Sequence, residues 1–149
     1  METIQQPIEY KQRYTKGGLE LYELLLSTNE ISEGSELAIL TLWGSCISRE
    51  NAVRYGLTVD KNRKFLFKNA EDLFFTIIRK KPEMFEKWLL LTEEYIESGF
   101  DSNYRPNIDR IDNDGDYEFD NIQALSSIGN RMKEWSVIPK TSEWYDLTY

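Results

Sequence analysis

The sequence predicts an α+β fold that is mostly helical and has a small strand–strand–helix (ββα) unit near its C-terminus. Residues 36–54 and 82–98 place apolar side chains three and four positions apart, which indicates amphipathic helices. After residue 104 the pattern changes to short apolar stretches around an Asn-Asp-Gly turn, as in a hairpin. The length of 149 residues fits one domain. We expect an N-terminal arm (1–17), a single domain (18–136) with its ββα core at 104–135, and a C-terminal tail (137–149).

The N-terminal third predicts an arm and two helices. Residues 1–17 are mostly polar and lead into a glycine pair, which predicts an irregular arm. A short helix is expected over 19–28. Ser35 can cap a second helix that runs to about Arg54 and is ended by Gly56. The buried face of that second helix is expected to hold Ile39, Leu40, Trp43, Cys46 and Ile47.

The middle of the chain predicts a hairpin and two more helices. Residues 57–67 carry an Asp-Lys-Asn turn between apolar residues, which favours a small hairpin. Asn69 can cap the next helix, and Pro82 can open another at a position where its missing N–H costs nothing. Gly99 is expected to end it. Its apolar stripe comprises Met84, Phe85, Trp88, Leu89, Thr92, Tyr95 and Ile96.

The C-terminal part predicts the ββα unit. Residues 107–111 form the first expected strand, residues 113–115 the turn and residues 122–125 the second strand. Ser126 or Ser127 can then cap a helix over 128–135.

Composition excludes several classes of protein. The chain has no histidine and one cysteine, Cys46, which excludes Ser-His-Asp and Cys-His catalysis, histidine-ligated metals, a Cys-rich zinc site and a disulfide framework. Neither a signal peptide nor an apolar stretch of membrane-spanning length is present, so we expect a cytoplasmic protein. The net charge is −8, yet residues 61–81 carry seven basic and two acidic side chains. This basic segment is either a solvated face or a DNA contact.

Five aspartates, at positions 109, 112, 114, 116 and 120, lie close together. An EF-hand calcium loop with Gly115 at its sixth position would have Arg110 at its first and Asn121 at its twelfth, so the pattern does not fit. A solvated, Asp-capped turn is the simpler structural interpretation of the cluster.

The same segment carries a family resemblance. Residues 106–123 read PNIDRIDNDGDYEFDNIQ, and Asn130 follows Asn121 after eight intervening residues. This pattern resembles the core of HNH (His-Me finger) endonucleases, and is most similar to a phage-associated subgroup with an Ile-Asp-Arg-Ile-Asp core. The match covers about residues 104–133, with a fainter upstream match at Leu42-Trp43, Arg49 and Tyr55-Gly56.

The resemblance implies a His-Me finger-like ββα fold around one Mg²⁺ or Mn²⁺ ion and no zinc. By position, Asp109, Asn121 and Asn130 would be the metal ligands. The family's catalytic histidine position is Arg110, which cannot act as a base but can contact phosphate. The general base would then be Asp112, Tyr117 or metal-bound water. Simpler roles remain open, because Asn121 can cap the backbone and Asn130 can be a surface residue.

Two functions follow from the resemblance. The first is a metal-dependent DNA endonuclease that grips its substrate with Lys61, Arg63, Lys64, Lys68 and Arg110. The second is an HNH-derived acidic protein that no longer cuts and instead inhibits a host protein, one involved in defence or nucleic-acid binding, through that protein's basic surface. Like charges among the five aspartates predict that a divalent ion would stabilise the loop, and that Asp109→Ala would be neutral or slightly stabilising without metal.

Overall fold

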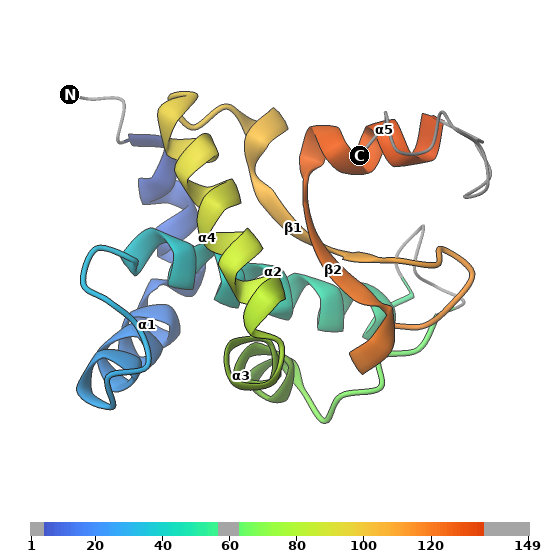
Figure 1. The fold of residues 1–149 in the computed structure, drawn as a ribbon, viewed down its shortest axis with the longest axis horizontal. Helices are drawn as coiled ribbons and strands as arrows, with labels where there is room; N and C mark the ends of the chain where they lie inside the picture. The colour runs from blue at the N-terminus through green and yellow to red at the C-terminus, as the bar shows by residue number, and fades with distance from the viewer. Residues whose placement is uncertain (1–4, 57–62, 136–149) are drawn as a thin grey trace.

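Helix α2 (Glu36–Arg54) is the central element of the fold (Figure 1). The computed structural model describes residues 5–56 and 63–135. Five consecutive residues of α2, Ala38 to Leu42, are buried, so the first half of this helix has no solvent-facing side. Its neighbours are α1 (Gln5–Ser27), α3 (Ala70–Lys80), α4 (Pro82–Glu97) and β1 (Pro106–Arg110).

Helix α1 corrects the predicted N-terminal arm. The chain is helical from Gln5 onward, so the prediction of an irregular segment up to residue 17 is wrong for most of its length. The glycine pair does not end a segment but allows α1 to approach α2 closely. A Cβ atom at Gly18 would lie 2.4 Å from Leu40 Cδ2, and one at Gly17 would lie 3.0 Å from Trp43 Nε1.

The predicted starts of α3 and α4 are present, whereas the predicted side-chain cap of α2 is not. Asn69 accepts a hydrogen bond from Asp72 N at 2.9 Å, and the Asp72 carboxylate accepts one from Lys68 N, as in a capping box. Pro82 is the first residue of α4. Ser35 precedes α2, but its hydroxyl donates to Ser32 O instead of capping the helix.

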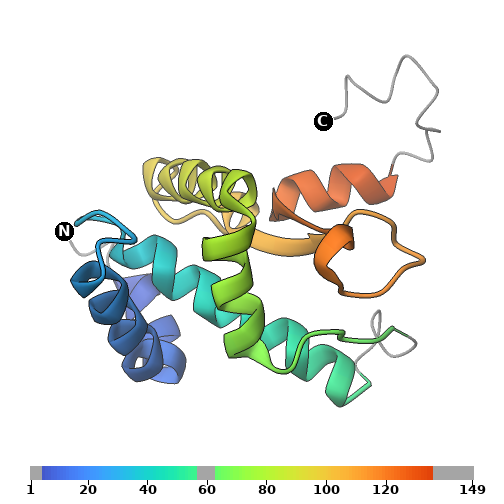
Figure 2. The ribbon, with the colours of Figure 1, turned by 60° about the horizontal axis from the view of Figure 1, so that its bottom comes forward.

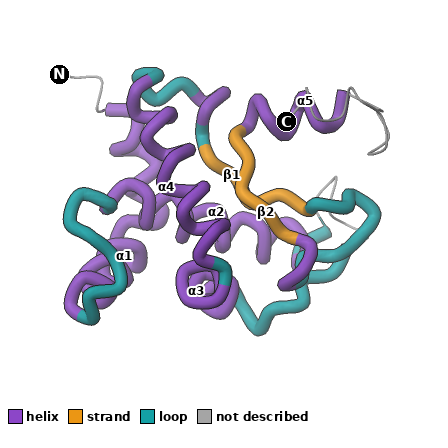
Figure 3. Tube along the Cα trace, in the orientation of Figure 1, coloured by secondary structure: helices purple, strands orange, loops and turns teal. Residues whose placement is uncertain are grey.

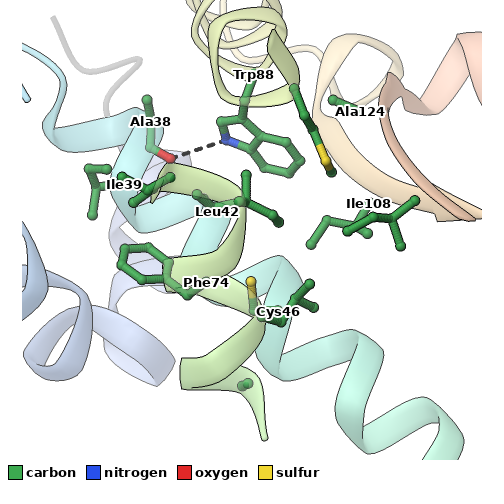
Figure 4. Packing of buried hydrophobic residues seen from close by; sticks show 14 of the residues in the cluster. Ala38, Ile39, Leu42, Cys46, Phe74, Trp88, Ile108 and Ala124 are labelled. Atoms are coloured by element: carbon green, nitrogen blue, oxygen red, sulfur yellow. Dashed lines mark hydrogen bonds between the residues drawn. The ribbon is translucent and has the colours of Figure 1, made fainter. Parts of the chain in front are cut away.

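The core lies between α2, α3 and α4 (Figure 4). Trp88 of α4 is fully buried and donates from Nε1 to both Ala38 O and Thr41 Oγ1 at 3.1 Å. The indole thereby adds a polar anchor to its apolar packing. Along α4, Leu91 is buried and Ile96 is 46% exposed, so the buried stripe is rotated slightly from the predicted one. Cys46 is buried in this core, as its place on the apolar face predicts.

Strands β1 and β2 (Ile122–Ser126) pair antiparallel, with Asp109 opposite Gln123, and form a two-stranded sheet packed against α2 and α4. Short 3₁₀ turns cover Ser102–Tyr104 and Phe119–Asn121. Helix α5 (Ser127–Trp135) follows β2, and Ser126 Oγ accepts from Gly129 N at its start. The α+β, mostly helical class is therefore confirmed for the described residues (Figure 3).

The loop between β1 and β2 projects from the side of the molecule opposite α1 (Figure 2). It contacts a second segment, because Tyr117 N donates to Lys64 O and Leu66 N donates to Tyr117 O. The hairpin predicted over 57–67 lies partly outside the described residues, and its described end pairs with Tyr117. The predicted tail, 137–149, lies outside them entirely. None of the helices in the described ranges is long and apolar enough to span a bilayer.

Candidate functional site

Two adjacent charged residues at the end of β1, Asp109 and Arg110, are buried. The two residues are 7% and 9% exposed, and no other charged residue whose burial the structure describes is buried. Successive residues of a strand face opposite sides, so the two side chains enter different environments. Asp109 faces α5, whereas Arg110 faces the β1–β2 loop.

The carboxylate of Asp109 is neutralised by a lysine of α5. Lys133 Nζ lies 2.6 Å from Asp109 Oδ2, and Gln123 Nε2 donates to the same oxygen at 3.0 Å. Gln123 reaches Asp109 because the strand register places them opposite each other. A buried carboxylate with an ion-pair partner and a further donor avoids most of the cost of desolvation.

The ammonium of Lys133 has three oxygen acceptors. Besides Asp109 Oδ2, it donates to Asn113 Oδ1 at 2.9 Å and to the main-chain oxygen of Arg110. A lysine ammonium has three N–H donors, so these acceptors match its full capacity. Lys133 thereby joins α5, the end of β1 and the start of the loop around one positive charge.

Arg110 holds the loop in its shape. Its Nη1 donates to the main-chain oxygens of Asn113 and Gly115, the latter at 3.1 Å. Its guanidinium also lies 5.3 Å from the ring centroid of Tyr117, which is buried and accepts from Arg49 Nη1 at 3.2 Å. Arg110 and Tyr117, both predicted to be catalytic, therefore contribute to the loop's structure.

Asn121 closes the base of the same loop. Its Oδ1 accepts from Asp112 N at 2.8 Å, and its Nδ2 donates to Asp112 O at 3.1 Å and Asp116 O at 2.9 Å. The backbone-capping alternative for Asn121 is thus realised, since all three bonds join its amide to the loop backbone. Asn121 bonds to the backbone of Asp112 and Asp116, whereas Asp109 bonds to Lys133 and Gln123, so these hydrogen bonds give the two side chains no common partner.

The other predicted site residues are dispersed. Asp112 is exposed and accepts from Asp114 N at 2.9 Å, and Asn130 is half-buried in α5. Arg63 Nη2 lies 3.6 Å from Asp114 Oδ1, at the far end of the loop. Side chains of Arg54, Arg63, Lys64 and Lys68 line a shallow groove of about 450 Å³ together with Glu50. Lys61 lies outside the described residues.

The centre of this cluster is surrounded by oxygen atoms of the kind that bind a cation. Three oxygens, Asp109 Oδ2, Asn113 Oδ1 and Arg110 O, converge on the position of Lys133 Nζ. Hard oxygens of this kind suit Mg²⁺ or Mn²⁺. Within the described ranges, however, no three carboxylate or thiol side chains gather in a metal-binding group.

Lys133 and Gln123 are members of the cluster that the sequence analysis missed. A signal for Gln123 was available, because an antiparallel hairpin that pairs residue 110 with residue 122 also pairs 109 with 123. Lys133 depends on the direction in which α5 leaves β2, which no local pattern encodes. Comparison of the chain with protein-family models, curated proteins and solved structures returns no match.

Proposed function

We propose that this protein is an HNH-like, metal-dependent DNA endonuclease whose centre is the cluster of Asp109, Arg110 and Lys133. The observation that carries the proposal is the meeting of two buried charged residues, Asp109 and Arg110, with the half-buried Lys133 at the junction of a hairpin and a helix. Burying charges costs several kcal/mol per ion, so a fold that keeps them together at one place does so at a cost in stability that a functional role would explain. The cluster coincides with the residues that carry the family resemblance.

The residues of the cluster suit chemistry on a phosphodiester. Asp109, Asn113 and the main-chain oxygen of Arg110 would hold the divalent ion in place of Lys133 Nζ. When bound, that ion would neutralise charge on the scissile phosphate and the leaving oxygen. Lys133, once displaced, and Arg110 are cations that can contact phosphate oxygens. Of the two predicted bases, Asp112 is exposed and Tyr117 is buried, which favours Asp112.

A second candidate function has a specific observation in its favour. The Asp109 carboxylate is already paired with Lys133, and the Asn121 amide is bonded to the loop backbone. An HNH-derived scaffold that no longer cuts would look like this. With a net charge of −8, such a protein would instead bind the basic surface of a host protein.

A plasmid-nicking assay separates the two functions. Purified protein is incubated with supercoiled plasmid and either Mg²⁺, Mn²⁺ or chelator. The endonuclease proposal expects nicking only with metal, and a loss of roughly a hundredfold or more in Asp109→Asn. Asp120→Asn is the matched control, since it removes an exposed aspartate charge from the same loop and should leave nicking unchanged.

Two results of this assay would contradict the endonuclease proposal. If the wild-type protein nicks with neither metal, the endonuclease proposal is overturned and the non-cutting scaffold is favoured. If nicking persists in Asp109→Asn, the activity does not come from this cluster.

A further inference from the structure

A second surface feature, which shares only Gln123 with the Asp109 cluster, is a groove of about 570 Å³ between the α3–α4 corner and β2. In Figure 1 the α3–α4 corner and the start of β2 lie beside each other in the lower half of the molecule. Lys80 and Lys81 line the groove from the corner, and Lys87 lines it from the next turns of α4. Phe119 and Gln123 line it from the hairpin.

The groove is positively charged. Three lysines line it against one acid, Glu83. Lys81 is committed to the protein, because its Nζ donates to Phe119 O at 2.7 Å and lies 4.2 Å from the centroid of that ring. Lys80 and Lys87 are exposed, and neither ammonium forms an ion pair with a carboxylate in residues 5–56 or 63–135. Two unpaired cations are therefore available to an anion.

Apart from Glu83 and Gln123, the remaining residues that line the groove are apolar. Met84, Ile122 and Ala124 are buried and form part of its lining. Phe119 is 42% exposed, so part of its ring is accessible at the mouth of the groove while Lys81 fixes its position. A site with apolar walls, one aromatic ring and convergent cations matches the properties of small-molecule sites of roughly 300–1,000 Å³.

We propose that this groove binds a nucleotide, with the phosphate on Lys80 and Lys87 and the base against Phe119. A phosphate group satisfies two ammonium groups, and base–aromatic contact is tolerant of base identity. A simple inorganic anion would leave the apolar walls and the ring without a partner. The nucleotide is either free or part of a DNA strand, since both present the same phosphate and base.

Binding without metal tests this inference independently of cutting. Fluorescence anisotropy is measured in chelator with a labelled purine nucleoside monophosphate and with a labelled short single-stranded DNA. The double variant Lys80→Gln/Lys87→Gln is compared with Lys16→Gln/Arg105→Gln, which makes the same change of charge at two exposed residues that line neither basic groove. Phe119→Leu tests the contribution of the ring.

We expect the wild type to bind the mononucleotide, the Lys80/Lys87 variant to bind it roughly tenfold more weakly, and the Lys16/Arg105 variant to be unchanged. Phe119→Leu should also weaken binding. If only the DNA strand binds, with the same order among the variants, the nucleotide is recognised within a strand. The proposal is overturned if neither probe binds, if the Lys16/Arg105 variant loses as much binding as the Lys80/Lys87 variant, or if inorganic phosphate competes as well as the nucleotide does. Because no metal is present, a chain that never cuts DNA can still satisfy the test.

Discussion

The ammonium nitrogen of Lys133 lies 2.6 Å from Asp109 Oδ2, with the two side chains 10% and 8% exposed, respectively. The remaining N–H donors of Lys133 are taken by Asn113 Oδ1 and the main-chain oxygen of Arg110. This ion pair joins α5 to the hairpin, whose sheet has only the two strands β1 and β2. Both the stability of the C-terminal unit and its affinity for cations should therefore depend on it.

Removing either partner should cost more than removing both. Lys133→Met or Asp109→Leu leaves one buried charge without its counter-charge, and each should lower the free energy of unfolding by about 3–5 kcal/mol. The double variant Asp109→Leu/Lys133→Met should lower it by clearly less than the sum, because no unpaired charge remains. Urea denaturation of the four proteins at neutral pH measures this coupling. Strictly additive losses would show that the two charges do not interact in solution.

Removing only the ammonium should open the cluster to a divalent ion. In Lys133→Ala, the oxygens of Asp109, Asn113 and Arg110 lose the cation on which they converge. Mg²⁺ or Mn²⁺ at a hundredfold excess over its Kd would stabilise this variant by about 2.7 kcal/mol, a rise of several degrees in Tm. The wild type should respond less, since the ion must displace Lys133.

Thermal melting with chelator and with metal measures this response. Adding Asp109→Ala to Lys133→Ala should abolish it. An equal rise in Tm for the wild type and all variants would place the ion elsewhere, among the exposed aspartates of the loop.

The comparison of sequence and structure shows which interactions local patterns encode. The hairpin, the helix after it and the Asn69 and Pro82 helix starts follow from turn, capping and periodicity signals that span a few residues. For Asp109, charge repulsion alone predicted that its loss would be neutral or slightly stabilising. Its actual partner lies 24 positions later in the chain and is placed by tertiary packing.

Gly115 and Asn121 should behave as a coupled pair. A Cβ atom at Gly115 would lie 2.7 Å from Asn121 Nδ2, so Gly115→Ala must displace the amide that closes the loop. Asn121→Ala removes three hydrogen bonds, each worth about 1 kcal/mol, and should destabilise the protein by roughly 2–3 kcal/mol. Gly115→Ala should cost a substantial part of that amount in the wild type and much less in Asn121→Ala. Chemical denaturation of the wild type, the two single variants and the double variant gives this double-mutant cycle. If Gly115→Ala costs as much in the Asn121→Ala background as in the wild type, the two residues are not coupled.

Cys46 should make stability depend on alkaline pH. Burial raises the pKa of its thiol well above the ordinary value, so the folded thiol stays protonated where the unfolded thiol ionises. The unfolded state then binds fewer protons, and the free energy of unfolding should fall as pH rises above about 8.5. Cys46→Ala should be less stable at neutral pH because of the cavity, yet lose less stability between about pH 8 and 10. Equal losses in the two proteins over this range would mean that the thiol does not contribute.

Substitution of Gly18 tests whether the missing side chain is what allows α1 to pack closely on α2. In an exposed helix interior, replacing glycine by alanine stabilises by about 1 kcal/mol, because alanine has the higher helix propensity. At Gly18 the new Cβ would lie 2.4 Å from Leu40 Cδ2, and Leu40 is buried at 1% exposure, so its side chain has no open space to enter. Overpacking of this kind costs about 1–3 kcal/mol, which outweighs the gain in propensity. Gly18→Ala should therefore lower the free energy of unfolding. The same substitution should cost less in a Leu40→Ala background, where the clashing side chain has been removed. Urea denaturation of the two single variants and the double variant measures both effects, and an increase in stability for Gly18→Ala would show that α1 and α2 are not held at this separation.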